Sequence, residues 1–165
     1  MTRVLLLSIM LAFCSGAFAA SVETGKPVPS FSIKTLDGKI ITPATSKGRV
    51  LVINLWATWS EPCRKEMPAI DAFYKKNHAQ GVDVVAVSLD ESSGIAKVKQ
   101  FAGAFAFPAA MLAEADLQSF GRIWRVPVTF VIDQNGIVRH NGWKGDPLVD
   151  EAILDKTVAP LLVAP

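Results

Sequence analysis

Cys63 lies where a sulfur atom could do chemistry, at a predicted junction between a strand and a helix. Residues 50–55 form a β-rich apolar run, which is typical of a strand buried on both faces. Glu61 and Pro62 then suit the first turn of a helix. The free N–H groups and the partial positive charge of a helix start favour a thiolate over a thiol. The sequence therefore predicts that Cys63 is a reactive cysteine.

The segment around this cysteine, residues 56–68, reads W-A-T-W-S-E-P-C-R-K-E-M-P. It resembles the active-site segment of the exported TlpA/ResA-like thiol–disulfide oxidoreductases, which reads W-A-T-W-C-x-P-C-[RK]-x-E-x-P. The resemblance covers roughly residues 29–160. It implies a thioredoxin-like α/β fold, in which helices flank a central mixed sheet and an N-terminal β-hairpin is added. One position departs from the pattern, because Ser60 stands where the family has its first cysteine.

Disulfide exchange requires two sulfur atoms that act in turn. One thiolate attacks the substrate disulfide, and a second thiol then displaces the resulting mixed disulfide. The resemblance implies that Ser60 takes the place of the attacking sulfur and Cys63 that of the less exposed, resolving one. A serine hydroxyl forms no S–S bond, so the ordinary dithiol cycle is impossible within this chain. The first interpretation is an exported oxidoreductase for protein thiols or disulfides, whose first cysteine has drifted or been replaced.

Two other interpretations remain open. The spacing of Ser60 and Cys63 is similar to the S/T-x-x-C of peroxiredoxins, in which the hydroxyl helps hold peroxide near one thiolate. Arg125 could lie close by, because it directly precedes the Val126-Pro127 pair, but the P-x-x-x-T-x-x-C segment of that family is missing. The third interpretation is a non-catalytic domain that binds an extended peptide or a partner protein through the former active-site groove.

Val126 and Pro127 form the second part of the predicted site. The resemblance implies a cis proline opposite the active-site helix, which would leave the Val126 backbone N–H and C=O open to an extended peptide. The alternative is a proline that merely begins a strand. Glu61 could act as a local base, or could simply complement the helix dipole. The predicted catalytic residues are Cys63, Ser60 and Glu61, and the predicted substrate-binding residues are Trp59, Pro62, Val126 and Pro127.

The remaining residues near the site are expected to be structural. Asn54, on the central strand, is predicted to be a hydrogen-bonded core amide. Arg64 and Glu66 are predicted to lie on a solvated helix face. Of Trp56 and Trp59, we expect one in the core and the other as a wall of the groove.

Metal binding is not expected, and neither is a cofactor. Cys63 and Met67 are four residues apart on one helix face and could hold copper(I) with a third ligand. His78 and His140, however, have no local partner that could complete such a site. His78 lies near a predicted helix end, where it is more often an ordinary capping residue.

The N-terminus has the pattern of a secretory signal peptide. Arg3 supplies a basic start, residues 4–13 are apolar, and Ala17-Phe18-Ala19 forms a small-x-small cleavage site. The alternative is an uncleaved membrane anchor, but a span takes about 18 unbroken apolar residues. We therefore expect a signal peptide at 1–19 and a periplasmic or otherwise exported domain at 20–165. Cleavage would also remove Cys14 and leave Cys63 as the only cysteine.

The composition indicates one globular domain, because 165 residues with 50% hydrophobic content can bury a proper core. Loss of Arg3 with the signal peptide would lower the net charge from +2 to +1. With so small a charge, no nucleic-acid partner is expected. We also expect a monomer. Strands alternate with helices, which favours an α/β fold. The predicted strands are residues 31–36, 39–41, 50–55, 82–89, 108–112, 126–132 and 137–140, and the predicted helices are residues 61–80, 95–105, 115–124 and 150–162.

Overall fold

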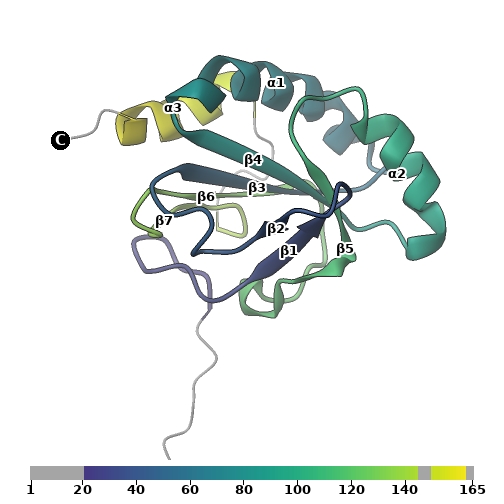
Figure 1. Cartoon of the computed structure of the whole chain (residues 1–165), viewed down its shortest axis with the longest axis horizontal. Helices are drawn as coiled ribbons and strands as arrows, with labels where there is room; N and C mark the ends of the chain where they lie inside the picture. The colour runs from purple at the N-terminus through teal and green to yellow at the C-terminus, as the bar shows by residue number, and fades with distance from the viewer. Residues whose placement is uncertain (1–20, 145–149, 163–165) are drawn as a thin grey trace, which may run out of the picture.

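A computed structural model describes residues 21–144 and 150–162, so the predicted signal peptide and Cys14 lie outside the described residues. The described chain forms one seven-stranded mixed sheet in the order β2-β1-β5-β4-β3-β6-β7 (Figure 1). The strands are β1 (Ser32–Thr35), β2 (Ile40–Ile41), β3 (Val50–Trp56), β4 (Val82–Ser88), β5 (Ala109–Asp116), β6 (Val128–Ile132) and β7 (Val138–Asn141). The helices are α1 (Glu61–Asn77), α2 (Ile95–Ala102) and α3 (Glu151–Leu162), with short 3-10 turns at His78–Gln80, Ser92–Gly94 and Gln118–Phe120.

Strand β3 is the centre of the sheet and leads directly to the Cys63 helix. Every residue of β3 is buried, as its apolar run predicts. It pairs in parallel with β4 from Val50↔Val82 to Trp56↔Ser88. On its other side it pairs antiparallel with β6, and Leu55 lies opposite Val128. The end of β3 and the start of β6 therefore lie side by side, at the same end of the strands.

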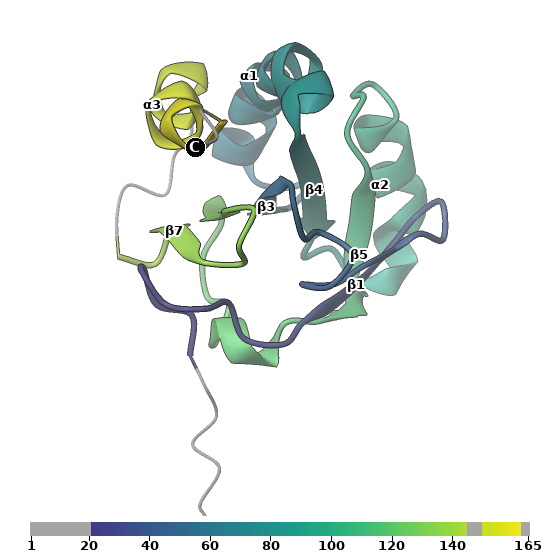
Figure 2. The same ribbon diagram turned by 60° about the vertical axis from the view of Figure 1, so that its left-hand side comes forward.

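Two hydrophobic clusters divide the core between the faces of the sheet. All three helices pack on one face, where Met67 and Phe73 of α1, Val98 of α2 and Leu154 of α3 belong to one cluster. Figure 2 shows the helices on the same side of the sheet, with α1 and α3 next to one another. The N-terminal segment and the turn at Gln118–Phe120 contribute to the cluster on the other face. The mixed α/β architecture is thus confirmed.

The predicted N-terminal hairpin is also confirmed. Ile33 of β1 pairs with Ile41 of β2 in antiparallel register, around the predicted Asp37-Gly38 turn. Gly38 has a φ of 88°, which a residue without a side chain adopts at little cost. The hairpin joins the main sheet because β1 also pairs with β5.

The predicted helix at residues 115–124 is wrong. Ala115 and Asp116 instead extend β5, where they pair with Ile33 and Ser32 of the hairpin. The chain then forms only one 3-10 turn, at Gln118–Phe120. Helix propensity is a weak preference, and pairing with an available strand outweighs it here.

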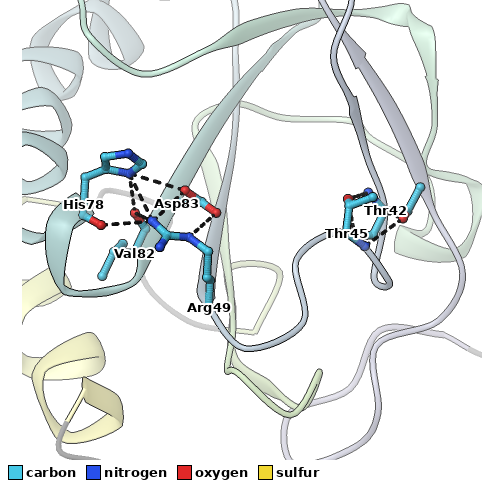
Figure 3. Close-up of polar contacts among 6 residues, drawn as sticks. All are labelled: Thr42, Thr45, Arg49, His78, Val82 and Asp83. Carbon is cyan, nitrogen blue, oxygen red and sulfur yellow. Dashed lines mark hydrogen bonds and ion pairs between the residues drawn. The ribbon is translucent and has the colours of Figure 1, made fainter.

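The far end of α1 is fixed by Arg49, the residue before β3 (Figure 3). Its Nε and Nη2 atoms donate to the two carboxylate oxygens of Asp83, at 2.7 and 3.0 Å, and Nη2 also donates to the His78 carbonyl at 2.9 Å. His78 is the C-cap of α1, as predicted, and Gly81 follows with a left-handed φ of 97°. Such two-pronged, charge-assisted contacts are among the stronger hydrogen bonds in proteins. The helix that carries Cys63 is therefore held at the end opposite to this cysteine.

Candidate functional site

Ser60 begins the helix that presents Cys63. After β3 the chain makes a tight turn, in which the Ser60 N–H donates to the Ala57 carbonyl at 3.1 Å. Ser60 is the N-cap of α1, and its hydroxyl oxygen accepts the Cys63 N–H at 3.3 Å. The same oxygen accepts a hydrogen bond from the Cys63 thiol. The two residues that the sequence singles out are thus in direct contact, with the serine oxygen beside the sulfur.

Cys63 is closed off from solvent. Its side chain is 0% exposed and belongs to the helix-side core cluster, together with Trp56 and Met67. Ser60 is only 6% exposed and forms part of the cover. No other cysteine lies among the described residues.

Burial decides the ionisation of Cys63. It raises the pKa of the Cys63 thiol above its ordinary value, although hydrogen bonding with the Ala57 backbone and with the Ser60 hydroxyl, which can turn to donate to the ionised sulfur, acts in the opposite direction. The negative charge of Glu66 raises this pKa further. The expectation that the helix start makes Cys63 a thiolate is therefore wrong for the structure at rest. The helix dipole is present, but the loss of hydration outweighs it.

Glu66 is a second correction, because it is buried rather than solvated. Only 6% of the residue is exposed, and its carboxylate accepts a hydrogen bond from Asn54 Nδ2 at 2.7 Å. The Asn54 amide also donates to the Thr129 hydroxyl at 3.0 Å, while its Oδ1 atom has no hydrogen-bond partner among the described residues. The sequence does hold a signal for this carboxylate, since Glu66 lies three residues after Cys63 and four before Ile70, on the apolar face of the helix.

The exposed residues of the site surround this buried centre. Trp59 is 66% exposed while Trp56 is fully buried, which resolves the expected division between core and groove wall. Pro62 is exposed in the first turn of α1. Glu61 is also exposed, and its carboxylate forms an ion pair with Lys65 at 2.8 Å that lowers the Glu61 pKa. This pairing favours the interpretation of Glu61 as an acid that complements the helix start.

Val126 and Pro127 lie at the same end of the strands as the turn that leads to Cys63, because β6 begins at Val128, opposite Leu55 near the end of β3. The Val126–Pro127 peptide bond is cis. Val126 is partly buried and packs against both core clusters, including the one that contains Cys63. The fold thus brings the two predicted halves of the site together.

Arg125 does not take the place that a peroxidase site would give it. Its Nη2 atom donates to the Gly142 carbonyl at 2.9 Å and to the Trp143 carbonyl at 3.4 Å. The guanidinium carbon also lies 5.1 Å from the centre of the Trp124 ring. These contacts direct the guanidinium toward the segment after β7. Together with the buried Cys63 sulfur, they weaken the peroxidase interpretation.

Metal ligands do not gather in the described part of the chain. Residues 21–144 and 150–162 contain no group of three or more His, Cys, Asp or Glu side chains that could hold a metal ion. The His78 ring lies beside Arg49, Val82 and Asp83. Among the same described residues, no helix has the length and apolar character needed to cross a membrane.

Comparison with known proteins places this site in a family. Residues 24–141 match the AhpC/TSA family. The thiol-disulfide oxidoreductase ResA of Bacillus cereus (strain ATCC 10987 / NRS 248) is 32% identical over 149 residues, which cover 82% of this chain and 85% of that protein. The thioredoxin-like protein YneN of Bacillus subtilis (strain 168) is 31% identical over 121 residues, which cover 72% of this chain and 70% of that protein.

Solved structures agree with the sequence comparisons. A thiol:disulfide interchange protein of the thioredoxin family from Chlorobium tepidum TLS superposes with a TM-score of 0.67 and 27% identity, over 86% of this chain and 99% of that one. StoA from Bacillus subtilis matches the fold with a TM-score of 0.60, over 81% of this chain and 98% of that one. The chain therefore belongs to the AhpC/TSA family and, within it, to the ResA-like thiol–disulfide oxidoreductases of thioredoxin-like fold.

Proposed function

We propose that this protein is an exported thiol–disulfide oxidoreductase in which Cys63 is the only redox-active sulfur. The observation that carries the proposal is the contact between the Ser60 hydroxyl and the Cys63 thiol at the start of α1. An oxygen lies beside the buried sulfur, Trp59 is exposed in the adjoining turn, and the cis proline directly precedes β6, whose start lies opposite the end of β3. The site keeps the surroundings for thiol chemistry but only one sulfur to perform it.

A single sulfur can still rearrange disulfides. Once the buried sulfur has been exposed, the Cys63 thiol loses its proton to solvent, and the thiolate then attacks one sulfur of a partner disulfide. That S–S bond breaks, a mixed disulfide with Cys63 forms, and a partner thiolate leaves. Another thiolate of the partner then attacks the partner sulfur of the mixed disulfide, which forms a new partner disulfide and releases the Cys63 thiolate. No electrons are gained or lost overall, so we propose rearrangement rather than net reduction as the reaction.

The partner is proposed to be a protein segment that carries a thiol or a disulfide and binds in an extended form. Trp59 and Pro62 are exposed beside the start of α1 and would contact this segment on one side. The Val126 and Pro127 backbone would pair with it on the other side, as an added strand pairs with a sheet edge. This assignment gives the predicted substrate-binding residues their roles.

Export is proposed from the pattern at residues 1–19, which lie outside the described part of the chain. An exported location also suits a protein with partner disulfides, because disulfides persist outside the reducing cytosol. Signal cleavage would leave Cys63 without any intrachain partner. N-terminal sequencing of the protein recovered from the periplasm tests this proposal, and a mature N-terminus at residue 20 is the expected result.

Trapping of a mixed disulfide tests the chemistry. The protein is incubated with a peptide disulfide, quenched with acid and analysed by mass spectrometry, with Cys63→Ala as the control. We expect one peptide adduct, located on Cys63, and no adduct on the control. The variant Ser60→Cys should in addition gain reduction of a protein disulfide with dithiothreitol as electron donor. A folded protein that forms no adduct, and a folded S60C variant that stays inactive, would contradict the proposal.

A non-catalytic binding domain is the second candidate, and the complete burial of Cys63 favours it. In that case the surface around Trp59, Pro62 and Val126 would bind an extended partner segment without any covalent step. Cys63→Ala would then bind a peptide as tightly as the unchanged protein does, whether or not the peptide contains cysteine. If Cys63 contributes a mixed disulfide, the alanine variant should instead lose the stable complex with a cysteine-containing peptide.

A further inference from the structure

Thr58 is bound on two sides in the turn that covers Cys63. Its N–H donates to the Asp90 carboxylate at 2.8 Å, and its hydroxyl donates to the other oxygen of the same carboxylate. From the opposite side, Arg64 Nη1 donates to the Thr58 carbonyl at 2.6 Å. Both backbone groups and the side chain of this one residue are therefore engaged. We call this arrangement of Thr58, Asp90 and Arg64 the Thr58 clamp.

The Asp90 side of the clamp is anchored in the sheet. Ser88, the last residue of β4, is fully buried, and its hydroxyl donates to Asp90 Oδ2 at 2.6 Å. The Asp90 N–H in turn donates to the Ser88 oxygen at 3.1 Å. Despite burial, which acts in the opposite direction, the hydrogen bonds from Ser88 and Thr58 lower the pKa of Asp90 below its ordinary value. The clamp therefore contains a carboxylate at neutral pH, and hydrogen bonds to an ionised group are the stronger kind.

The Arg64 side is anchored in the helix. Arg64 follows Cys63 directly in α1, and its backbone N–H donates to the Ser60 carbonyl at 3.1 Å. The same residue thus holds both ends of the segment from Thr58 to Ser60. The two charged groups of the clamp come from different elements, Asp90 from the end of β4 and Arg64 from the start of α1.

The clamp determines how the cover over Cys63 can open. Ala57 and Ser60 are joined by a backbone hydrogen bond, which closes the turn that contains Thr58 and Trp59. The Ser60 hydroxyl is part of that turn and contacts the Cys63 thiol. A rotation of the turn that lifts Ser60 away from the sulfur would also displace Thr58, and would break its bonds to Asp90 and Arg64. Exposure of the sulfur is therefore coupled to release of the clamp.

We propose that Asp90 and Arg64 are positioning residues that keep the turn closed over Cys63, and that a partner must release Thr58 before the sulfur can react. The need for a partner rests on the function proposed above, whereas the closed turn concerns only the accessibility of Cys63. Trp59 lies in the same turn, next to Thr58, and is 66% exposed. A partner that contacts Trp59 therefore acts directly on the segment that the clamp holds.

The test is the rate at which iodoacetamide labels Cys63 in the folded protein, measured together with the free energy of unfolding. Asp90→Asn removes the charge with little change in shape, and Arg64→Ala removes the other side of the clamp at an exposed position. Asp83→Asn is the matched control, because Asp83 is likewise a part-buried carboxylate that accepts hydrogen bonds, but it lies on β4 at the far end of α1. We expect labelling to be faster by about tenfold or more in D90N and in R64A, since a hydrogen bond to a charged group is lost. In D83N, the rate of Cys63 labelling should change only by the amount that the change in the free energy of unfolding accounts for.

The outcomes separate the clamp from the proposed function. If folded D90N and R64A are labelled at the unchanged rate, or only in step with their global unfolding, the clamp is refuted. If the unchanged protein still forms a mixed disulfide in that case, the proposed function stands without it. If both variants are labelled faster but no variant forms a mixed disulfide with a peptide, the clamp stands and the redox function fails.

Discussion

Replacement of Ser60 by alanine removes one oxygen that has two roles. The hydroxyl is the N-cap of α1, and it also accepts the hydrogen bond of the Cys63 thiol. Loss of an N-cap oxygen costs about 1 kcal/mol of stability, and loss of a further hydrogen bond in a buried site costs about 1 kcal/mol more. We therefore expect Ser60→Ala to lower the free energy of unfolding by about 2 kcal/mol.

The same change should affect the ionisation of Cys63. When the sulfur is ionised, the Ser60 hydroxyl can donate to it, and this lowers the pKa of Cys63 against the dominant effect of burial. Without it, the pKa should rise further as long as the sulfur stays buried. Ultraviolet absorbance of the thiolate as a function of pH measures this shift, and Cys63→Ala supplies the baseline.

Ser60→Thr is the matched control, because threonine keeps an oxygen that can cap the helix. Urea denaturation followed by tryptophan fluorescence gives the free energy of unfolding for each variant. We expect the threonine variant to stay close to the unchanged protein in both stability and pKa. If the alanine variant were as stable as the unchanged protein, with the same Cys63 pKa, the double role of the Ser60 oxygen would be refuted.

Three further predictions concern ionisable groups that are buried or half-buried. Burial lowers the pKa of His140 below its ordinary value of 6.5, so the unfolded chain binds a proton more readily than the folded chain does. The free energy of unfolding should therefore fall as the pH drops below 6.5, and His140→Gln should flatten that part of a pH–stability curve. Asp133 accepts hydrogen bonds from two backbone N–H groups and from Arg139, so Asp133→Ala should lower the free energy of unfolding in urea by about 3 kcal/mol. The charge of Glu66 raises the pKa of Cys63, so Glu66→Gln should lower that pKa in a thiolate titration, and an unchanged value would show that the two groups do not interact.

The parts of the fold that the sequence predicts are those with one dominant local signal. The central strand is apolar at every position except Asn54, which favours burial on both faces. The Asp37-Gly38 pair fixes the hairpin, because the turn needs a positive φ at the glycine. The helix at residues 115–124 fails for the opposite reason. Its alanine, leucine and glutamine residues favour a helix only weakly, and the edge of β1 is a partner that no local pattern reveals.

The candidate site shows the same division between local and tertiary information. The position of Cys63 in the first turn of a helix follows from neighbouring residues, and the structure confirms it. Its raised pKa does not follow from them, because it depends on how fully the rest of the fold covers the sulfur. The charge of Glu66 alone favours a solvated face, whereas in the structure Asn54 on the central strand provides it with a partner inside the core. The Thr58 clamp joins residues 32 positions apart and has no local signature.

The most direct test of the central claim is the search for a covalent bond between Cys63 and a partner peptide. The unchanged protein is mixed with a peptide disulfide near neutral pH, quenched with acid, digested and analysed by mass spectrometry. The account predicts a mixed disulfide between the peptide and Cys63. When the peptide carries a further thiol, that thiol should displace Cys63, and the mixed disulfide should disappear. A folded protein whose Cys63 remains a free thiol throughout would contradict the claim that this sulfur is redox-active.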